Sequence, residues 1–251
     1  LLQATDCTGD DIATRLENAR QIIEKRVNGL GVSEPLVQIQ GDCRILIELP
    51  AMDTPADALA LIQQTGRLEW TDNGQDFYQA GQIIRTTGNP SPSAANSVTE
   101  TATLSGTLPV TATIPDKVYT TIVNGADLNP TQLTVQLGGV GNNEPQVSFV
   151  LQGASVQTFA SYTANNVGSY ACIVLDNVVQ SCPRIQSQIP NGQGVITVGT
   201  GGVDEANRLV NLLRYGALPV ALQVAQSRTI GPTLGEDSIR ASVLAGLIGL
   251  V

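Results

Sequence analysis

Residues 205–251 have the sequence EANRLVNLLRYGALPVALQVAQSRTIGPTLGEDSIRASVLAGLIGLV, and this segment changes character three times. Apolar residues recur at helical spacing from Ala206 to Leu213 and Gly216 follows them, which predicts a helix with an ordinary end. Apolar and polar residues then alternate from Val220 to Gln226, which predicts a strand. The final ASVLAGLIGLV carries no charge but is shorter than the about 20 apolar residues that a membrane span needs, so we interpret residues 237–251 as the start of a transmembrane helix.

The first 72 residues predict a regular order of strands and helices. The expected elements are a strand at 1–4, a helix at 12–27, a hairpin of strands at 36–40 and 44–49, a helix at 55–62 and a strand that starts at Leu68. Helical apolar spacing supports the first helix, and alternation on both sides of Gly41-Asp42 supports the hairpin. This is the split βαβ order, so residues 1–72 are interpreted as a ferredoxin-like base.

Basic residues lie along the predicted first helix. They are Arg15, Arg20, Lys25 and Arg26. Glu17 and Glu24 are interleaved with them. A basic docking face is one interpretation, but charges of alternating sign are typical of a solvated face, which we favour here.

Residues 117–216 predict a second unit, an α+β head. Its expected elements are strands at 132–137 and 146–152, a helix at 155–167, a hairpin at 171–175 and 178–185, a strand at 195–198 and the helix described above. Between the units, residues 86–107 are mostly Ser, Thr, Ala, Pro, Asn and Gly, so residues 73–116 are interpreted as a linker or a loose hairpin. The strand at 220–226 could belong to either sheet. Two cores joined in this way would let the head rotate on the base.

Composition excludes several classes of function. The net charge is -9 with 13 basic residues, which argues against nucleic acid and anionic membrane surfaces as the main partners. The chain has no histidine, so imidazole bases, Ser-His-Asp triads and histidine metal sites are excluded. No motif indicates a catalytic, metal or cofactor site, and we expect neither an enzyme nor a cofactor, although a hydrolase that uses paired carboxylates stays open. The cluster from Asp72 to Asp76 lacks the later Glu of a calcium loop and is interpreted as a turn.

Three segments carry a resemblance to a known family. Residues 212–235, LLRYGALPVALQVAQSRTIGPTLG, are similar to the segment that leads the protein-export subunit SecD from its first periplasmic domain into its second membrane helix. The order and spacing of GALPV and GPTLG, just ahead of an apolar helix, make this match specific. RQIIEKRVNGLGVSEP at 20–35 resembles the first helix of that domain with its exit turn, and CIVLDNVVQSCPRI at 172–185 resembles its later hairpin. The resemblance covers most of the chain and is weak between Thr71 and Asp116.

The resemblance to SecD implies both a fold and a function. It implies that residues 217–236 return to complete the base, and that the chain is the extracytoplasmic domain of a multi-pass protein of the cell membrane. It also implies an export subunit that works with SecF and the SecYEG channel and uses the proton gradient to draw unfolded preproteins outward. The proton-coupling residues of that family lie in membrane helices outside this segment. The alternative is the porter domain of a drug or lipid exporter of the same wider RND superfamily, in which split βαβ units also occur.

The four cysteines are even in number and form no CxxC pair, which suits an oxidising compartment. Cys7 follows the first predicted strand and Cys43 precedes the third. These strands are antiparallel neighbours in a split βαβ sheet, so we predict a disulfide between them. Cys172 and Cys182 flank a predicted turn. A three-residue loop centred on Asn177 would set them opposite each other for a second disulfide, whereas a two-residue loop would put them on opposite faces.

Contact with unfolded preproteins is predicted for the head. Its Thr- and Val-rich strands at 132–137 and 146–152 could pair with an extended segment through main-chain hydrogen bonds, which do not depend on side-chain identity. Val135 and Phe149 are the candidate contact residues on these strands. The alternative is that both strands lie inside the sheet and are fully paired, because edge strands are usually protected.

Overall fold

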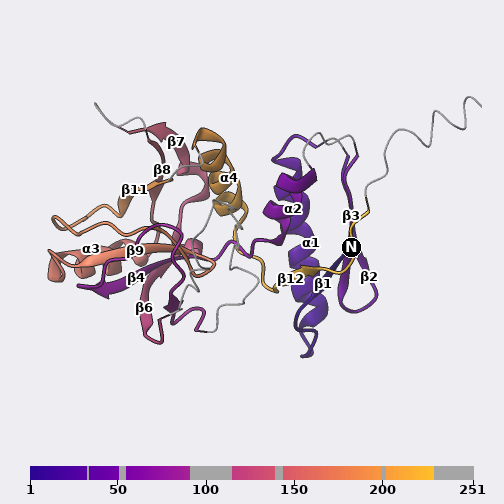
Figure 1. Ribbon diagram of the computed structural model, residues 1–251, viewed down its shortest axis with the longest axis horizontal. Helices are drawn as coiled ribbons and strands as arrows, with labels where there is room; N and C mark the ends of the chain where they lie inside the picture. Colours follow the sequence, from indigo (N-terminus) through magenta and orange to yellow (C-terminus); the bar gives the residue numbers. More distant parts are fainter. Residues whose placement is uncertain (33, 51–54, 91–114, 139–143, 199–201, 229–251) are drawn as a thin grey trace, which may run out of the picture.

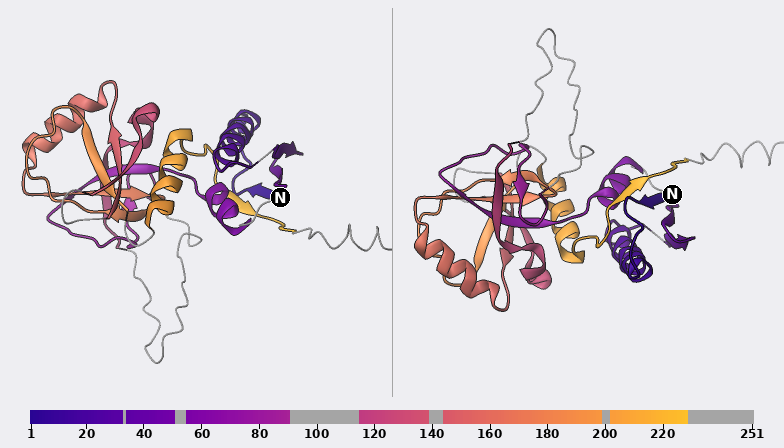
Figure 2. Two further views of the ribbon diagram at one scale, coloured as in Figure 1. Left: turned by 90° about the horizontal axis from the view of Figure 1, so that it is seen from above. Right: turned by 90° about the horizontal axis from the view of Figure 1, so that it is seen from below.

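The computed structural model describes residues 1–32, 34–50, 55–90, 115–138, 144–198 and 202–228. These residues form two units that lie side by side (Figure 1). We call the unit that holds the N-terminus the base and the other unit the head. Figure 2 shows this division from above and below, and in both views the helix α4 (Gly202–Tyr215) is the part of the head that faces the base.

The base is a four-stranded antiparallel sheet with two helices. Its elements are β1 (Leu2–Ala4), α1 (Ile12–Asn28), β2 (Leu36–Gln40), β3 (Arg44–Glu48), α2 (Pro55–Gln63) and β12 (Leu222–Val224), in the strand order β12-β1-β3-β2. Leu16, Ala19 and Ile23 recur on one face of α1 and share a core with Ile45 of β3. The order of strands and helices is that of a split βαβ unit, which confirms the predicted α+β class.

The base does not contain the strand that was predicted to start at Leu68. The strand that begins at Leu68 is β4 (Leu68–Gly74), and it lies in the head between β6 (Val118–Asn124) and β9 (Tyr170–Leu175). Most side chains of β4 are buried, as expected for a strand covered on both faces and paired on both edges. The assignment of residues 68–72 to the base was therefore wrong. β12 fills the place beside β1, where the resemblance to SecD implied that the strand at 220–226 returns.

The head contains two sheets that share one core with α4. Besides β4, β6, β9 and α4, its elements are β5 (Arg85–Thr86), β7 (Thr134–Leu137), β8 (Pro145–Val150), α3 (Ser155–Asn165), β10 (Val178–Ser181) and β11 (Gln193–Thr197). The strand orders are β10-β9-β4-β6-β5 and β11-β8-β7. Trp70 of β4, Phe149 of β8 and Leu209 of α4 are buried in the same cluster, so both sheets and the helix are held by one core.

Residues 75–90 are not a linker between the units. They leave β4 and return to the same sheet as β5, which pairs in parallel with β6. Ile84 is fully buried; its N–H donates to the carbonyl oxygen of Asn177 at 2.9 Å, and Asn177 Nδ2 donates back to the Ile84 carbonyl at 2.9 Å. The predicted linker at 73–116 was therefore wrong for this part, because the Ser- and Thr-rich composition begins only after Ile84. Residues 91–114 lie outside the described residues.

The units are joined where α2 leads into β4 and where α4 leads into β12. Their apolar cores are separate clusters: Ile62 belongs to the core of the base, whereas its neighbour Leu61 belongs to the core of the head. Separate cores agree with the sequence interpretation, and rotation of the head stays a prediction.

No helix within the described ranges has both the length and the apolar character needed to cross a membrane. The expected start of a transmembrane helix at 237–251 lies outside those ranges.

Candidate functional site

The strand β7 is an exposed edge of the three-stranded sheet, since among the described strands it pairs with β8 alone. The register sets Leu137 opposite Pro145, and the Gly138 N–H donates to the Glu144 carbonyl oxygen at 3.0 Å. Bonded and non-bonded pairs alternate in an antiparallel ladder, so the N–H and C=O groups of Val135 and Leu137 point away from β8. Pro145 directs its main-chain groups to the other side, where its carbonyl oxygen accepts a hydrogen bond from the Val198 N–H at 3.0 Å.

A cleft of about 550 Å³ lies beside β7, between the head and the end of α1. Val135 of β7 and Val210 and Asn211 of α4 line the cleft from the head, and Gly29 lines it from the base. Val135 is half-buried, whereas the side chain of Leu137 at the end of the strand is 60% exposed. A groove beside an open strand edge can accept an extended chain, with main-chain hydrogen bonds from the edge and side chains in the groove.

Polar groups lie where α4 borders the cleft. Arg214 Nη2 donates to the Leu133 carbonyl oxygen at 3.4 Å, and Asn211 Oδ1 is buried with no hydrogen-bond partner in the described part of the chain. A Cβ atom on Gly29 would lie 2.5 Å from Asn211 Nδ2, so a glycine is needed for α1 to approach α4 this closely. The described lining therefore combines apolar groups with a cation and amides and includes no acidic residue.

The structure separates the two predicted contact residues. Val135 lies on the open edge strand and lines the cleft. Phe149 lies on β8, which pairs with β7 and β11, and it is 3% exposed because its ring packs against Trp70. The two strands therefore differ: β7 is the edge strand that the first prediction requires, whereas β8 is interior, as the alternative held. Phe149 was the wrong candidate for direct contact, since alternation along β8 points its side chain into the core.

A disulfide joins Cys7 to Cys43 in the base, with the two Cα atoms 5.8 Å apart. Cys7 follows β1 and Cys43 precedes β3, and these strands are antiparallel neighbours in the sheet. The bond therefore links the ends of two paired strands, as the split βαβ topology predicted.

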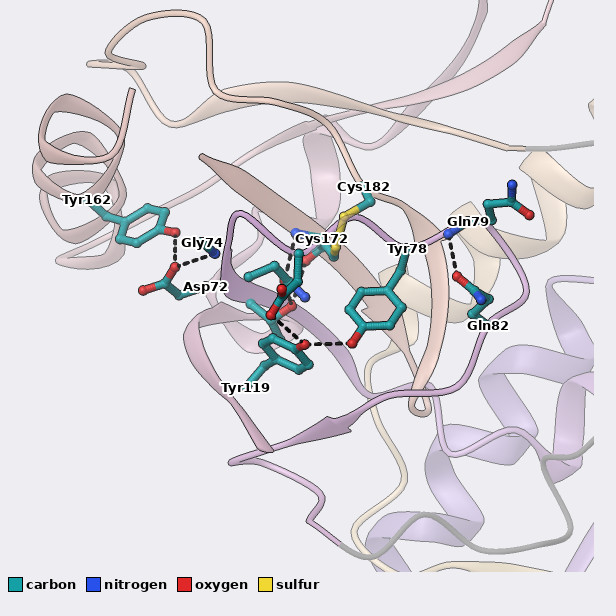
Figure 3. The surroundings of a disulfide bond; sticks show 12 residues. Asp72, Gly74, Tyr78, Gln79, Gln82, Tyr119, Tyr162, Cys172 and Cys182 are labelled. Atoms are coloured by element: carbon teal, nitrogen blue, oxygen red, sulfur yellow. Dashed lines mark hydrogen bonds between the residues drawn. A yellow bond between two sulfur atoms is a disulfide. The ribbon is translucent and has the colours of Figure 1, made fainter. Parts of the chain in front are cut away.

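The second disulfide joins Cys172 to Cys182, with a Cα separation of 3.9 Å (Figure 3). The turn before β10 has two residues, Asp176 and Asn177, both in the left-handed region at φ 49° and 70°. Such a turn alone would put the cysteines on opposite faces. A bulge between Val179 and the end of β10 shifts the register by one residue and brings them together again. The prediction that the bond requires a three-residue loop was therefore wrong.

Side chains near this disulfide form a hydrogen-bonded network, part of which Figure 3 shows. The hydroxyls of Tyr78 and Tyr119 lie 2.6 Å apart, and Tyr119 donates to Asp76 Oδ2 at 3.0 Å. Lys117 donates to the same oxygen at 2.5 Å, and these bonds hold the pKa of Asp76 below its usual value. Burial raises the pKa of Tyr119. Each of these four side chains is hydrogen-bonded to another of the four. We therefore interpret the network as structural: it holds residues 76–78 against β6 and the residue before it.

The turn predicted from Asp72 to Asp76 is seen only in its second part: residues 72–74 end β4, and the Asp76 N–H then donates to the Asn73 carbonyl oxygen at 2.9 Å. Asp72 Oδ1 accepts hydrogen bonds from the Gly74 N–H at 3.1 Å and from the Tyr162 hydroxyl at 2.9 Å (Figure 3). Within the described ranges no group of three or more His, Cys, Asp or Glu side chains is placed to hold a metal ion. Asp72 therefore ties the end of β4 to α3.

Arg26 is an important residue that the sequence interpretation missed. It was assigned to a solvated helix face, and the structure buries it completely. That interpretation suits Arg20, whose guanidinium lies 2.7 Å from Glu17 and 2.8 Å from Glu24 near the surface. The signal was in the spacing: Arg26 follows Ile23 by three residues and so lies on the apolar stripe of α1.

Two family models match the chain. Residues 16–88 match "Protein translocase subunit SecDF, P1 domain, N-terminal", and residues 111–220 match "SecDF, P1 head subdomain". A solved structure, "Structure and function of a membrane component SecDF that enhances protein export", is 31% identical with a TM-score of 0.65, and the match covers 91% of this chain and 98% of that one. The chain belongs to the SecD/SecDF P1 domain family. A second SecDF structure, "Crystal structure of SecDF in Super-membrane-facing form", matches 99% of this chain and 32% of that one, at 33% identity and a TM-score of 0.69.

SecD and SecDF subunits are among the relatives of this chain. SecD of Thermobaculum terrenum is 36% identical over 295 residues, covering 100% of this chain and 55% of that protein. SecDF of Thermus thermophilus is 37% identical over 242 residues, covering 93% of this chain and 30% of that protein. The chain therefore spans about half or less of the SecD and SecDF relatives named here. These relatives are named as translocase subunits and not as enzymes, and they favour the SecD assignment over an RND exporter.

Proposed function

We propose that this chain is the extracytoplasmic domain of a SecD subunit and that it handles unfolded preprotein segments as they emerge during export. Membership of the family supports the translocase assignment. Two disulfides agree with an oxidising compartment outside the cytoplasm. On the same basis we propose SecF, the SecYEG channel and preproteins as partners, within a multi-pass protein of the cell membrane that uses the proton gradient.

The open edge of β7 beside the cleft is the observation that carries the handling of preproteins. A receptor for many sequences needs contacts that do not depend on side chains, and main-chain pairing supplies them. Edge strands are often blocked by a charge or a proline, and the sequence of β7, TVQL, contains neither. The half-buried Val135 and the amide of Asn211 would then face the side chains of the added strand.

Photo-crosslinking in the full-length protein, with a preprotein stalled during export, tests the location. A photoreactive residue at Val135 or Leu137 should label the stalled chain. Controls at Val167, which is 57% exposed after α3, and at Ile47 in the base should label it far less. Labelling at Ile47 with none on β7 would remove this edge from the mechanism.

A matched pair of variants tests the main-chain pairing itself. Leu137→Pro removes an N–H that points away from β8, whereas Leu137→Ala removes the side chain and keeps that N–H. Loss of one main-chain hydrogen bond should reduce crosslinking yield about fivefold in the proline variant, with the alanine variant near wild type. Equal yields in both variants would show that the edge does not pair with the preprotein.

A further inference from the structure

Two chain segments connect the base and the head, and they lie against each other. One runs from α2 to β4 through Thr65 and Gly66, and the other runs from α4 to β12 through Gly216 and Leu218. The Leu218 N–H donates to the Thr65 carbonyl oxygen at 2.7 Å, so the segments are paired where they cross between the units. Any change in the orientation of the head must act on this pair of segments.

The guanidinium of Arg26 binds both connecting segments from the base. Nη1 donates to the carbonyl oxygens of Leu61 at 3.1 Å and Gln64 at 2.6 Å. Nη2 donates to those of Thr65 at 3.0 Å and Gly216 at 2.7 Å. Burial lowers the pKa of Arg26 to about 10, which leaves the side chain a cation at neutral pH.

The positive charge of Arg26 lies near the C-terminal ends of two helices, where a cation is stabilised. The helix α2 of the base ends at Gln63, and the helix α4 of the head ends at Tyr215. Carbonyl oxygens at a helix C-terminus lack intrahelical partners and carry partial negative charge. Arg26 therefore lies between the C-terminal ends of one helix from each unit, where it binds the carbonyl oxygen of Leu61 in the last turn of α2 and that of Gly216, the residue after α4.

Asp176 holds the same crossing from the side of the head. It lies in the turn between β9 and β10, and its carboxylate accepts hydrogen bonds from the N–H groups of Gly66 and Arg67, both at 2.9 Å. Burial raises the pKa of Asp176, while these two donors and the nearby Arg26 act in the opposite direction. The carboxylate of Asp176 from the head and the guanidinium of Arg26 from the base thus bind neighbouring peptide groups of the segment that joins α2 to β4.

Glycine is required at the centre of this arrangement. Gly66 has φ +78°, and a Cβ atom there would lie 2.6 Å from Arg26 Nη2 and 3.1 Å from Leu212 Cγ. The guanidinium therefore occupies the space that a side chain at this position would need. The close fit leaves little room for the connecting segments to shift while Arg26 keeps its bonds.

We propose that Arg26 and Asp176 form a latch that stabilises the orientation of the head seen here and that must open before the head rotates on the base. The latch places the base residue Gly29, which follows α1, against α4 and so completes the cleft beside β7. This inference goes beyond the proposed function and does not rest on it, because it concerns the relative placement of two units whatever they bind. Removing either charge leaves buried polar groups without partners, which should release the crossing segments.

Hydrogen exchange measured by mass spectrometry on the full-length protein tests the latch. In Arg26→Met and Asp176→Asn, amides at 64–67 and 216–218 should exchange faster, by about a hundredfold for the loss of a buried charge. Amides of α3 and β8 in the head should keep their protection. Arg20→Met removes a surface charge from the same helix and should leave the crossing segments as protected as in wild type.

Energy transfer between unnatural fluorescent amino acids at Ile39 in the base and Val167 in the head gives the second readout, since both side chains are exposed. The latch predicts a narrower distance distribution for wild type and Arg20→Met than for Asp176→Asn. Should Arg26→Met unfold the base, Asp176→Asn still decides the matter through its head-side contacts. Unchanged exchange and an unchanged distance distribution in Asp176→Asn would overturn the proposal.

Discussion

The ring centroids of Trp70 and Phe149 lie 4.8 Å apart, and the two ring planes are tilted by 56° relative to each other. Trp70 comes from the five-stranded sheet and Phe149 from the three-stranded sheet, so this contact joins the two sheets of the head. Gly194 on the neighbouring strand β11 makes room for it, since a Cβ there would lie 2.6 Å from the Phe149 ring. This aromatic contact is therefore part of the core that holds the two sheets of the head together.

Phe149→Ala should lower the free energy of unfolding of the head by about 3–5 kcal/mol, because it removes a buried aromatic ring and leaves a cavity. Trp70 is the one tryptophan of the chain, so its fluorescence during urea unfolding reports on this region. Val167→Ala at an exposed position serves as the control and should change stability by less than about 0.5 kcal/mol. A loss below about 1 kcal/mol in Phe149→Ala would contradict the packing described here.

Gly88→Ala should destabilise the head through Glu69. A Cβ on Gly88 would lie 2.0 Å from Glu69 Oε1, and the buried Glu69 carboxylate accepts hydrogen bonds from Thr86 at 2.7 Å and Thr121 at 2.6 Å. Displacing this carboxylate should cost about 1–3 kcal/mol. In a double-mutant cycle the same change made in a Glu69→Ala background should cost much less, because the clash is gone. Equal costs in both backgrounds would mean that Glu69 is not the obstacle.

The two disulfides should stabilise different units. By the loop-entropy relation, sequence separations of 36 and 10 correspond to about 4 kcal/mol for Cys7–Cys43 and about 3 kcal/mol for Cys172–Cys182. Replacing Cys7 and Cys43 by Ala should make the base unfold first, so that the far-ultraviolet dichroism changes at lower urea than the Trp70 fluorescence. Replacing the pair in the head should shift the fluorescence transition instead. Coincident transitions in both variants would show that the units unfold as one.

Acid should weaken the surface ion pairs of α1. Hydrogen bonds from Arg20 hold the pKa of Glu17 at about 2 in the folded chain, whereas an unfolded glutamate titrates near about 4.3. The unfolded state therefore binds this proton first, so the contribution of Glu17 is complete above about pH 5 and is lost as the pH falls toward 2. The difference in melting temperature between wild type and Glu17→Gln should shrink over that range, and also at high salt. A difference that is constant from pH 7 to pH 3 would contradict this.

Local patterns in the sequence were sufficient to predict most elements of the fold. The apolar stripe of α1, the alternation around Gly41-Asp42 and the segment from Ala206 to Leu213 all describe contacts between residues close in sequence. The disulfide between Cys7 and Cys43 followed from the topology that these elements imply. Resemblance to SecD was carried by three such local segments, and the family comparisons confirmed it.

Tertiary structure alone decided which sheet each strand joins and which side chains meet across the fold. Leu68 and Trp70 are the only large apolar residues of β4, and this short pattern does not show that β4 pairs with β6 and β9 and leaves the base to β12. The acceptors around Arg26 come from segments up to 190 residues away, and no local pattern encodes them. Local spacing determines which face of an element is apolar, while the energy of burial and of buried hydrogen bonds depends on which distant elements come together to cover that face.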